Sequence, residues 1–460
     1  VFIFEIRNQF HELIFNNYSA AKGKWNIVLT RSWFISFICP ILMMVRSSRS
    51  ILSILVLISS TVCAQGRTDD FLKDLIWQHA SPQLQHVLSQ PDSFHYQIIY
   101  TRIDRDQHNH PRFTSFFYRF DTADYFNPAS TVKMPLSFLA LEKINGLKKK
   151  GISKFTPMLT DSSFSGQSTV VADTSSDNGW PSIGHYIKKV FLVSDNDAYN
   201  RLYEFLGQQH INERLWQMGY RDVRITRRFV PMSEEENRHT NSIRFIQNGK
   251  LLYNQPAAES TVAFDFSKPV FIGRAHWDQN DSLIQSPMDF TRHNNISLLD
   301  LHTILRSVLF PESVPPQKRF NLKKDDYEFL YRYMSEYPYE SHYPNYDTSE
   351  FFQSYAKFFF KAGRSPIPSS IRIFNKPGWS YGYLTDVTYV ADFKNKVEFM
   401  LSAVIYVNKD GVLNDNKYEY EEVGYPFFKE VFNIIYNYEL QRERAHAPDL
   451  RKFMIDYNAK

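Results

Sequence analysis

The sequence predicts an α+β fold, in which helices and antiparallel strands occupy separate stretches of the chain. On the N-terminal side, one helical pattern is followed by two strand patterns and then by another helix. The last third of the chain has three strand patterns followed by a closing helix. Because strands and helices do not alternate one by one, this order is not that of a parallel βαβ fold.

The first helix and the first two strands are expected before residue 121. Apolar residues recur at helical spacing from Asp69 to Leu88. Residues 94–101 and 112–120 are rich in β-branched and aromatic side chains, and the polar segment 104–109 lies between them. This pattern predicts two antiparallel strands joined as a hairpin.

The next helix is expected to begin near Ser130. Apolar side chains follow at the spacing of a buried helix: Leu136, Phe138, Leu139, Leu141 and Ile144. Residues three apart share one helix face, so the Lys133 ammonium can reach the Ser130 hydroxyl. A serine hydroxyl needs a neighbouring base to become a nucleophile, and a lysine can serve if burial lowers its pKa. The start of a helix also offers N–H groups to a developing oxyanion.

Two further helices are expected after the polar, loop-like residues 151–181. An apolar stretch from Gly184 leads to the triplet Ser194-Asp195-Asn196. Helical patterns then run over residues 198–206 and 211–218, and each ends at a glycine. Taken alone, the triplet has an ordinary structural interpretation as a helix N-cap, because all three residue types cap helices well.

The second half of the chain is less regular before its final strands. Residues 227–295 are polar and irregular, with weak strand patterns at 245–246 and 250–253, and residues 296–310 are expected to be helical. Aromatic residues crowd the segment 327–360, which favours core packing or the rim of a groove over stacking on sugars. The expected closing elements are strands at 371–376, 385–392 and 399–407, a helix at 425–438 and a tail from 442 to 460.

The N-terminal region has the pattern of a secretory signal peptide. Residues 1–42 show no clear pattern, and a basic segment from Met43 to Arg49 then precedes a short apolar run that ends near Ala64. We expect Met43 or Met44 to be the true start and cleavage to follow Ala64. The alternative is an N-terminal membrane anchor, because residues 33–42 are also apolar.

Cysteine and charge content narrow the chemistry of the expected mature chain. Cys39 and Cys63 both precede the expected cleavage site, so neither a disulfide nor a cysteine thiolate is available after it. A lipid anchor at Cys63 is the weaker interpretation, because Val62 is larger than such sites prefer. Of 53 basic and 49 acidic residues, six and two respectively precede Gln65, which leaves 47 of each. This balance does not point to nucleic acid.

Three short motifs stand in a fixed order along the chain. They are Ser130-Thr131-Val132-Lys133, Ser194-Asp195-Asn196 and Lys376-Pro377-Gly378. Together with the order of helices and strands, they resemble the serine β-lactamase and penicillin-binding protein superfamily. The stretch from Ser194 to Gly219 is most similar to class A β-lactamases.

The resemblance covers roughly residues 69–438 and implies a fold as well as a site. The implied fold is a β-lactamase-like, five-stranded antiparallel sheet flanked by helices, with an all-helical sub-domain. We therefore divide the chain into an upstream extension and signal peptide at 1–64, a hydrolase domain at 65–440 and a tail at 441–460. The hydrolase domain would carry insertions near 240–290 and 315–365.

The resemblance also implies a role for each motif residue. Ser130 would attack a carbonyl and form an acyl-enzyme, and Lys133 would take or relay its proton. Ser194 would pass a proton to the leaving nitrogen, and Asn196 would hold Lys133 or the substrate amide. Lys376 would attract a substrate carboxylate and keep the Ser194 proton mobile.

The third motif departs from the family pattern at its middle residue. The backbone N–H groups of Ser130 and Trp379 would form the oxyanion hole, and Gly378 would contact the substrate. The family usually has a hydroxyl residue where this chain has Pro377. Proline also lacks a backbone N–H, although it is tolerated on an edge strand. Recognition of a penicillin-like carboxylate is therefore expected to be weakened.

The glutamate that activates the deacylating water in class A enzymes has no clear counterpart. Glu236, together with Asn237 or Asn241, is the candidate, and Glu234 and Glu235 compete with it. A solvated acidic loop is the alternative interpretation of this segment.

We therefore expect an exported serine hydrolase, periplasmic or extracellular, that cleaves an amide or β-lactam through an acyl-Ser130 intermediate. The alternatives are a D-alanyl peptidase, a cell-wall amidase or esterase, or a protein that is acylated and stays acylated. The substrate would be a small molecule or peptidoglycan-like. No cofactor is expected, since the histidines show no ligand spacing, and no sequence feature points to a protein partner.

Overall fold

A five-stranded antiparallel sheet forms the centre of the fold in the computed structural model, which describes residues 66–364 and 366–458. Its strands stand in the order β12, β13, β14, β1 and β2. Their bounds are Gln97–Arg105 for β1, Pro111–Tyr118 for β2, Ile371–Ser380 for β12, Tyr383–Asp392 for β13 and Val397–Tyr406 for β14. Pairing of β1 with β14 joins the N-terminal hairpin to the three late strands. The predicted α+β class is confirmed.

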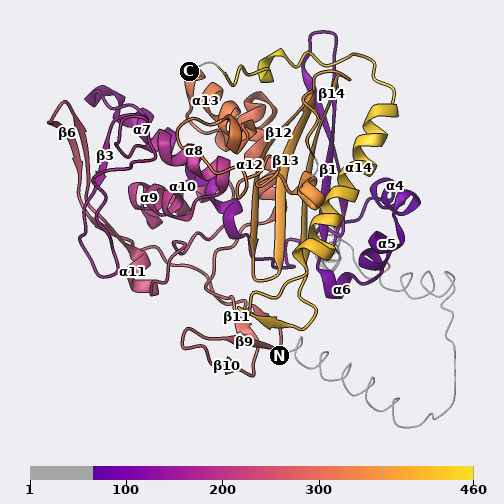
Figure 1. The fold of residues 1–460 in the computed structure, drawn as a ribbon, viewed down its shortest axis with the longest axis horizontal. Helices are drawn as coiled ribbons and strands as arrows, with labels where there is room; N and C mark the ends of the chain where they lie inside the picture. Colours follow the sequence, from indigo (N-terminus) through magenta and orange to yellow (C-terminus); the bar gives the residue numbers. More distant parts are fainter. Residues whose placement is uncertain (1–65, 365, 459–460) are drawn as a thin grey trace, which may run out of the picture. The chain divides into compact units, whose positions relative to one another are not determined.

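Helices cover both faces of this sheet (Figure 1). One face packs against α14 (Tyr425–Gln441) and α4 (Asp70–His79), and the other packs against α12 (Leu298–Leu309). Successive side chains of a strand point to opposite faces. Thus Ile373 belongs to the apolar cluster on the α14 side, whereas Phe374 belongs to the cluster on the α12 side.

The described residues form part of one compact unit, Gln65–Lys460. The predicted signal peptide, its cleavage site after Ala64 and both cysteines lie outside the described residues. Those expectations therefore remain predictions. Among the described helices, none combines the length and apolar character needed to cross a membrane.

The first helical pattern is divided into separate helices by prolines. After α4, a second helix, α5 (Pro82–Ser89), starts with Pro82 at its first turn, and Ser81 accepts a hydrogen bond from the Leu84 N–H. A proline has no N–H to continue the preceding helix but fits the first turn of a new one. A short helix, α6 (Pro91–Phe94), then leads into β1.

A helical sub-domain surrounds the helix that follows Ser130. Its helices are α7 (Lys133–Leu147), α8 (Ile183–Val193), α9 (Asn196–Leu206) and α10 (Gln208–Gln217). Every residue of α7 from Lys133 to Leu141 is buried, so this helix forms the centre of the sub-domain. The sub-domain also carries a small sheet of β3 (Met158–Thr160), β5 (Ile243–Gln247) and β6 (Lys250–Gln255). It is therefore helical but not purely so, and β5 and β6 coincide with the two weak strand patterns.

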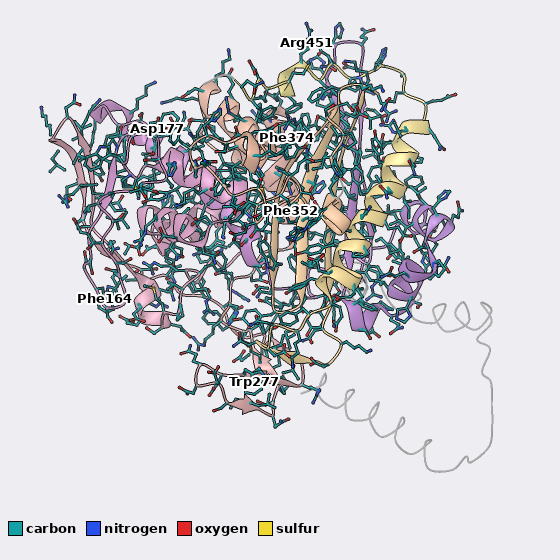
Figure 2. All side chains as sticks on the ribbon, in the orientation of Figure 1. Phe164, Asp177, Trp277, Phe352, Phe374 and Arg451 are labelled. Atoms are coloured by element: carbon teal, nitrogen blue, oxygen red, sulfur yellow. The ribbon has the colours of Figure 1, made fainter. Side chains whose placement is uncertain are left out.

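The irregular region between residues 227 and 295 contains one short helix and several very short strands. The helix is α11 (Glu234–Arg238), and the strands are β4 (His239–Thr240), β7 (Ala258–Glu259), β8 (Phe271–Ile272), β9 (Ala275–Trp277), β10 (Leu283–Ile284) and β11 (Met288–Asp289). Strand β9 also pairs with β15 (Val412–Leu413), which connects this irregular region to the chain after β14. In Figure 2, Trp277 lies at the rim of the molecule, far from the core residue Phe374.

The aromatic segment serves both of its predicted purposes. It begins with α13 (Lys324–Ser335) and continues through short 3₁₀ turns. Phe358 packs against the rings of Trp379, Tyr425 and Phe428, which is core packing. Tyr355 instead lines the cleft described below.

The C-terminal residues do not form a free tail, contrary to the sequence-based expectation. Leu450 and Phe453 are almost fully buried. The Phe453 ring packs against those of Phe374 and Tyr389 on the sheet, with centroid distances of 5.2 and 4.9 Å. The apolar residues near Phe453 lie in a polar stretch and follow neither the helical nor the strand period. Their burial could therefore not be predicted from the sequence pattern.

Replacing Phe453 with alanine should therefore destabilise the protein by about 3–5 kcal/mol, because a large buried side chain is lost and a cavity remains. Denaturant unfolding of Phe453→Ala measures this change. Met454→Ala is the matched control, since Met454 is 61% exposed, and its effect should stay within about 0.5 kcal/mol. Equal effects of the two substitutions would show that the C-terminal segment does not contribute to the core.

Candidate active site

Ser130 lies in a tight turn at the entrance to the buried helix α7. The turn is a 3₁₀ helix, Ala129–Val132, and α7 continues it directly. Asn127 accepts a hydrogen bond from the Ala129 N–H through Oδ1, at 3.1 Å, which fixes the approach to the turn. Ser130 is half-buried and lines a cleft of about 600 Å³.

Backbone strain is concentrated around this cleft. Four lining residues other than glycine have positive φ angles: Ala129 at 44°, Ser194 at 62°, Tyr381 at 52° and Asn414 at 62°. Such conformations cost free energy and persist where the surrounding structure enforces them, often at functional sites. The surrounding fold therefore holds the backbone around the cleft in a specific conformation.

Lys133 is fully buried, and its ammonium is held by the turn between α8 and α9. Its Nζ donates to the Ser194 carbonyl at 2.5 Å and to Asn196 Oδ1 at 2.6 Å, and Ser194 Oγ lies 3.4 Å away. Burial lowers the pKa of Lys133 to about 7. A substantial neutral fraction, able to accept a proton, is therefore present near pH 7.

The Ser194 hydroxyl lies between two lysines. Lys376 Nζ donates to Ser194 Oγ at 2.9 Å and to the Pro377 carbonyl at 2.8 Å. Burial, and next the positive charge of Lys133, lower the pKa of Lys376 well below its usual value. Because Ser194 Oγ accepts from Lys376, its own proton remains available to a group in the cleft.

The triplet Ser194-Asp195-Asn196 both caps a helix and places two side chains at the cleft. Asp195 is the N-cap of α9 and accepts from the Ala198 N–H at 2.7 Å. Ser194 and Asn196 point to the site and contact Lys133. The cap thus fixes the backbone from which the two site residues project.

Strand β12, which carries the third motif, is an edge strand of the sheet. The carbonyls of Ile371 and Ile373 accept from Tyr337 Oη and Lys357 Nζ, so both point away from β13. Backbone groups of alternate residues in a strand point the same way. Pro377 and Trp379 therefore also direct their backbone groups to the open edge. The N–H that Pro377 lacks is not needed for the sheet, and the Trp379 N–H faces the cleft.

A buried polar cluster covers the first half of that edge. Lys357 Nζ donates to the Ile373 carbonyl at 3.0 Å and to Asn375 Oδ1 at 2.6 Å. Asn375 in turn donates to Asp386 on β13, at 2.8 Å. The edge is therefore closed up to Asn375, and the part near Trp379 lines the cleft.

Gly378 allows the edge strand to approach the Ser130 turn. A Cβ atom at this position would lie 2.8 Å from the Pro128 carbonyl oxygen and 2.9 Å from the Ser130 amide nitrogen. Both are backbone atoms that cannot rotate away. The absence of a side chain therefore sets how closely β12 can approach the Ser130 turn.

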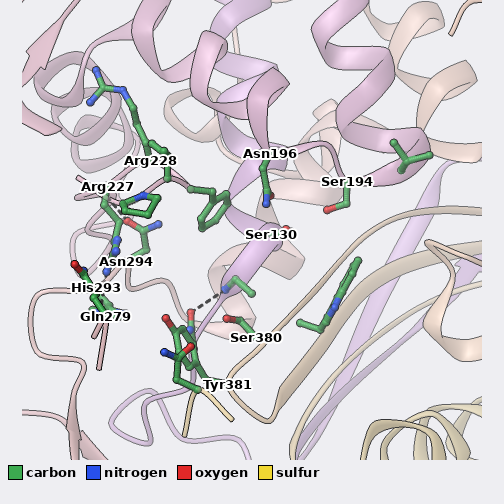
Figure 3. A pocket seen from close by; sticks show the side chains of 18 of the residues that line it. Ser130, Ser194, Asn196, Arg227, Arg228, Gln279, His293, Asn294, Ser380 and Tyr381 are labelled. Carbon is green, nitrogen blue, oxygen red and sulfur yellow. Dashed lines mark hydrogen bonds between the residues drawn. The ribbon is translucent and has the colours of Figure 1, made fainter. Parts of the chain in front are cut away.

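Ser130, Ser194, Asn196 and Trp379 thus line one cleft, and Figure 3 shows the first three side chains close together. The buried Lys133 and Lys376 both contact Ser194 Oγ. Within the described residues, Ser130 Oγ forms no hydrogen bond. Catalytic hydrogen bonds often tighten only when substrate is bound.

The acidic candidates do not join the site. Glu236 forms a capping box with Ser233 at the start of α11 and also accepts from Ser165 Oγ, and these hydrogen bonds lower the pKa of its carboxyl group. Glu234 pairs with Arg292, and Glu235 pairs with His239. The proposed role of Glu236 in water activation is therefore not supported by its position. The motif Ser-x-x-Glu before a short helix is itself a capping signature.

The sequence did not reveal the opposite wall of the cleft. Residues 227–231 form this wall, together with His293 and Asn294. No aspartate or glutamate is among the described residues that line the cleft. The adjacent arginines, Arg227 and Arg228, were the signal available in the sequence, whereas His293 had none.

Comparison with known proteins links the chain to β-lactamases. Residues 82–258 match the family model described as the beta-lactamase enzyme family. This match confirms the predicted resemblance. No curated protein matches the sequence.

Several solved structures are similar at low sequence identity. A β-lactamase from Sphaerobacter thermophilus is 12% identical, with a TM-score of 0.41, over 78% of this chain and 96% of that one. A β-lactamase from Xanthomonas campestris is 12% identical, with a TM-score of 0.43, over 79% of this chain and 98% of that one. The chromosome-encoded β-lactamase of Vibrio parahaemolyticus is 11% identical, with a TM-score of 0.42, over 78% and 99%.

A methyl group at Gly378 should force β12 away from the Ser130 turn. We expect Gly378→Ala to lower the free energy of unfolding by about 1–3 kcal/mol, as overpacking typically does. Gly146→Ala is the control, because a Cβ there would meet nothing within 4 Å, and alanine is the better helix former by about 1 kcal/mol. Denaturant unfolding of both variants tests this contact, and an unchanged stability of Gly378→Ala would contradict it.

Proposed function

Because residues 82–258 match the β-lactamase enzyme family, we propose that the protein is a β-lactamase-like serine hydrolase that opens an amide or β-lactam through an acyl-Ser130 intermediate. The buried ammonium of Lys133 carries this proposal. It lies one helical turn after Ser130, contacts Ser194 and Asn196, and has its pKa lowered to about 7 by burial. A lysine placed in this way can act as a general base at neutral pH.

Acylation would use the residues in a simple order. Neutral Lys133 accepts the Ser130 proton while Ser130 Oγ attacks the carbonyl carbon. The backbone N–H groups of Ser130 and Trp379 stabilise the oxyanion. When the carbon–nitrogen bond breaks, the Ser194 hydroxyl protonates the leaving nitrogen, and the lysines on either side of Ser194 replace that proton. The product is an ester on Ser130; the amine leaves when the substrate is an open-chain amide, and it stays attached to the acyl group when a β-lactam ring opens.

Deacylation would be the slower half of the reaction. A water molecule must be activated to hydrolyse the ester, and no carboxylate is found among the described residues that line the cleft. Neutral Lys133 remains as the base for this step. We therefore expect the acyl-enzyme to accumulate.

The same observation favours a second candidate function. A cleft without a water-activating carboxylate suits a D-alanyl peptidase, an amidase or esterase of the cell wall, or a protein that remains acylated. Pro377 supports slow β-lactam turnover, because it removes the hydroxyl that would bind an antibiotic carboxylate. The leader-like segment before Gln65 supports action outside the cytoplasm.

Intact-mass analysis after incubation with a penicillin tests the proposal directly. Wild-type protein should gain the mass of one whole β-lactam, and the adduct should decay slowly after excess penicillin is removed. Ser130→Ala should show no adduct. Ser93→Ala changes an exposed serine that does not line the cleft, and this variant should behave like the wild type. An adduct of equal yield on Ser130→Ala would place the nucleophile elsewhere.

The acylation rate should also depend on pH in a defined direction. Since Lys133 must be neutral to accept a proton and its pKa is about 7, the rate should fall about tenfold per unit as pH drops below 7 and level off above it. Acylation reactions stopped at set times and analysed by intact mass, from pH 5 to 9, give the dependence of the acylation rate on pH. Lys133→Arg keeps a cation that cannot deprotonate and should lose acylation at every pH. A flat wild-type profile would exclude Lys133 as the base.

A further inference from the structure

The cleft holds very few cations that a substrate could reach. Lys133 and Lys376 are fully buried, and their ammonium groups are already bonded inside the protein. Arg228 is 1% exposed and forms an ion pair with Glu204 at 2.6 Å. Its guanidinium also donates to the carbonyls of Glu236 and His239. The direct attraction of a substrate carboxylate by Lys376, which the sequence suggested, therefore has no open path.

Arg227 differs from these three residues. It is half-buried and lines the cleft, and within the described residues it has no carboxylate partner. Its main chain is fixed, because its N–H donates to Asn294 Oδ1 at 3.2 Å and its carbonyl accepts from Tyr199 Oη at 2.9 Å. The backbone from which the Arg227 side chain extends is therefore fixed in position.

His293 holds the Arg227 guanidinium in place. Arg227 Nη1 lies 3.0 Å from His293 Nε2. Burial, and next the charge of Arg227, lower the pKa of His293 to about 4, so the imidazole is neutral and accepts this hydrogen bond. The imidazole ring itself packs against Phe290, with centroids 4.5 Å apart. Within the described residues, no other hydrogen bond of the Arg227 guanidinium is present, so its remaining N–H groups can meet a ligand.

A half-buried guanidinium without a counter-ion has lost part of its hydration and gains from an anion in the cleft. Its planar fork matches a carboxylate best. Asn127 adds a second donor to the same cleft, because its Oδ1 accepts from Ala129 while its Nδ2 forms no hydrogen bond within the described residues. A single guanidinium suits a group with a single negative charge.

The position of Arg227 indicates which part of the substrate it meets. In Figure 3, Ser130 lies between Ser194 on one side and Arg227 with His293 on the other. Ser194 would protonate the leaving nitrogen, so the leaving group extends toward Ser194. The acyl part then extends toward Arg227.

We propose that Arg227 recognises a carboxylate on the acyl part of the substrate, remote from the bond that is cleaved. This inference rests on the proposed acylation of Ser130 and names the class of acyl donor that the cleft selects. It also gives the cleft an anion site at a place other than the third motif, where Pro377 has replaced the hydroxyl.

Matched acyl donors test the inference. Penicillins whose side-chain amide carries a glutaryl or an uncharged pentanoyl group differ only at the end of the acyl chain, and succinyl and adipoyl homologues vary the reach. Second-order rates of Ser130 acylation are measured by intact mass. Wild-type protein should prefer the best-fitting carboxylate compound by about ten- to a hundred-fold, the range expected for a hydrogen-bonded charge pair.

Two substitutions of Arg227 test whether this residue causes the preference for the charged compounds. Arg227→Gln should reduce the ratio of charged to uncharged rates to about one, and Arg227→Lys, which keeps the charge without the fork, should give an intermediate ratio. Arg292→Gln removes a nearby exposed arginine that pairs with Glu234 and should keep the wild-type ratio. If Arg227→Gln does not fold, the ratio measured for Arg227→Lys decides. An intermediate ratio supports the role of Arg227, and the wild-type ratio contradicts it.

The outcomes separate this inference from the proposed function. If neither compound acylates Ser130, the proposed function fails. If both acylate it and no chain length shows a preference, or if Arg227→Gln keeps the preference, the role of Arg227 is overturned while the acyl-enzyme stands.

Discussion

The burial of one ammonium group, that of Lys133, constrains most of the site. A charge inside a protein must be neutralised or surrounded by hydrogen-bond acceptors. Here the acceptors come from the turn between α8 and α9, through the Ser194 carbonyl and the Asn196 side chain. The lysine therefore requires α7 and this turn to meet at one point. The left-handed conformation of Ser194 and the capping of α9 by Asp195 are how the chain forms that turn.

The open edge of β12 is the second constraint. An edge strand exposes unpaired backbone groups, and proteins usually cover or interrupt such edges. In this protein the Lys357–Asn375–Asp386 cluster covers the first part, and Pro377 removes a donor just beyond it. Near Trp379, the edge lines the cleft. Segment 315–365, which the sequence predicts to be an insertion, supplies Lys357 and thus supports the strand on which the third motif lies.

The sequence was most informative where chemistry and local pattern coincide. The order of strands and helices and the three motifs predicted the sheet and the placement of Ser130, Ser194, Asn196 and Lys376. Glu236 instead takes part in a helix cap and is not among the described residues that line the cleft, because the same residues satisfy a local capping requirement that competes with any distant role. The pair formed by Arg227 and His293 could not be predicted, since 66 positions separate the two residues and neither belongs to a periodic pattern. The buried C-terminal segment was missed for a similar reason, because Phe453 packs against strands far away in the sequence.

The pairing of β1 with β14 has a consequence for how the chain reaches this structure. The N-terminal hairpin can form early, but the inner edge of β1 stays open until nearly the whole chain has been synthesised. Folds that depend on contacts between distant segments form slowly, and an open strand edge is prone to pair with other chains in the meantime. A chain that crosses a membrane unfolded would avoid this interval in the cytoplasm, because its first and last strands would meet only on the far side. The same topology means that a product truncated before β14 lacks the strand that pairs with β1 and cannot close the sheet.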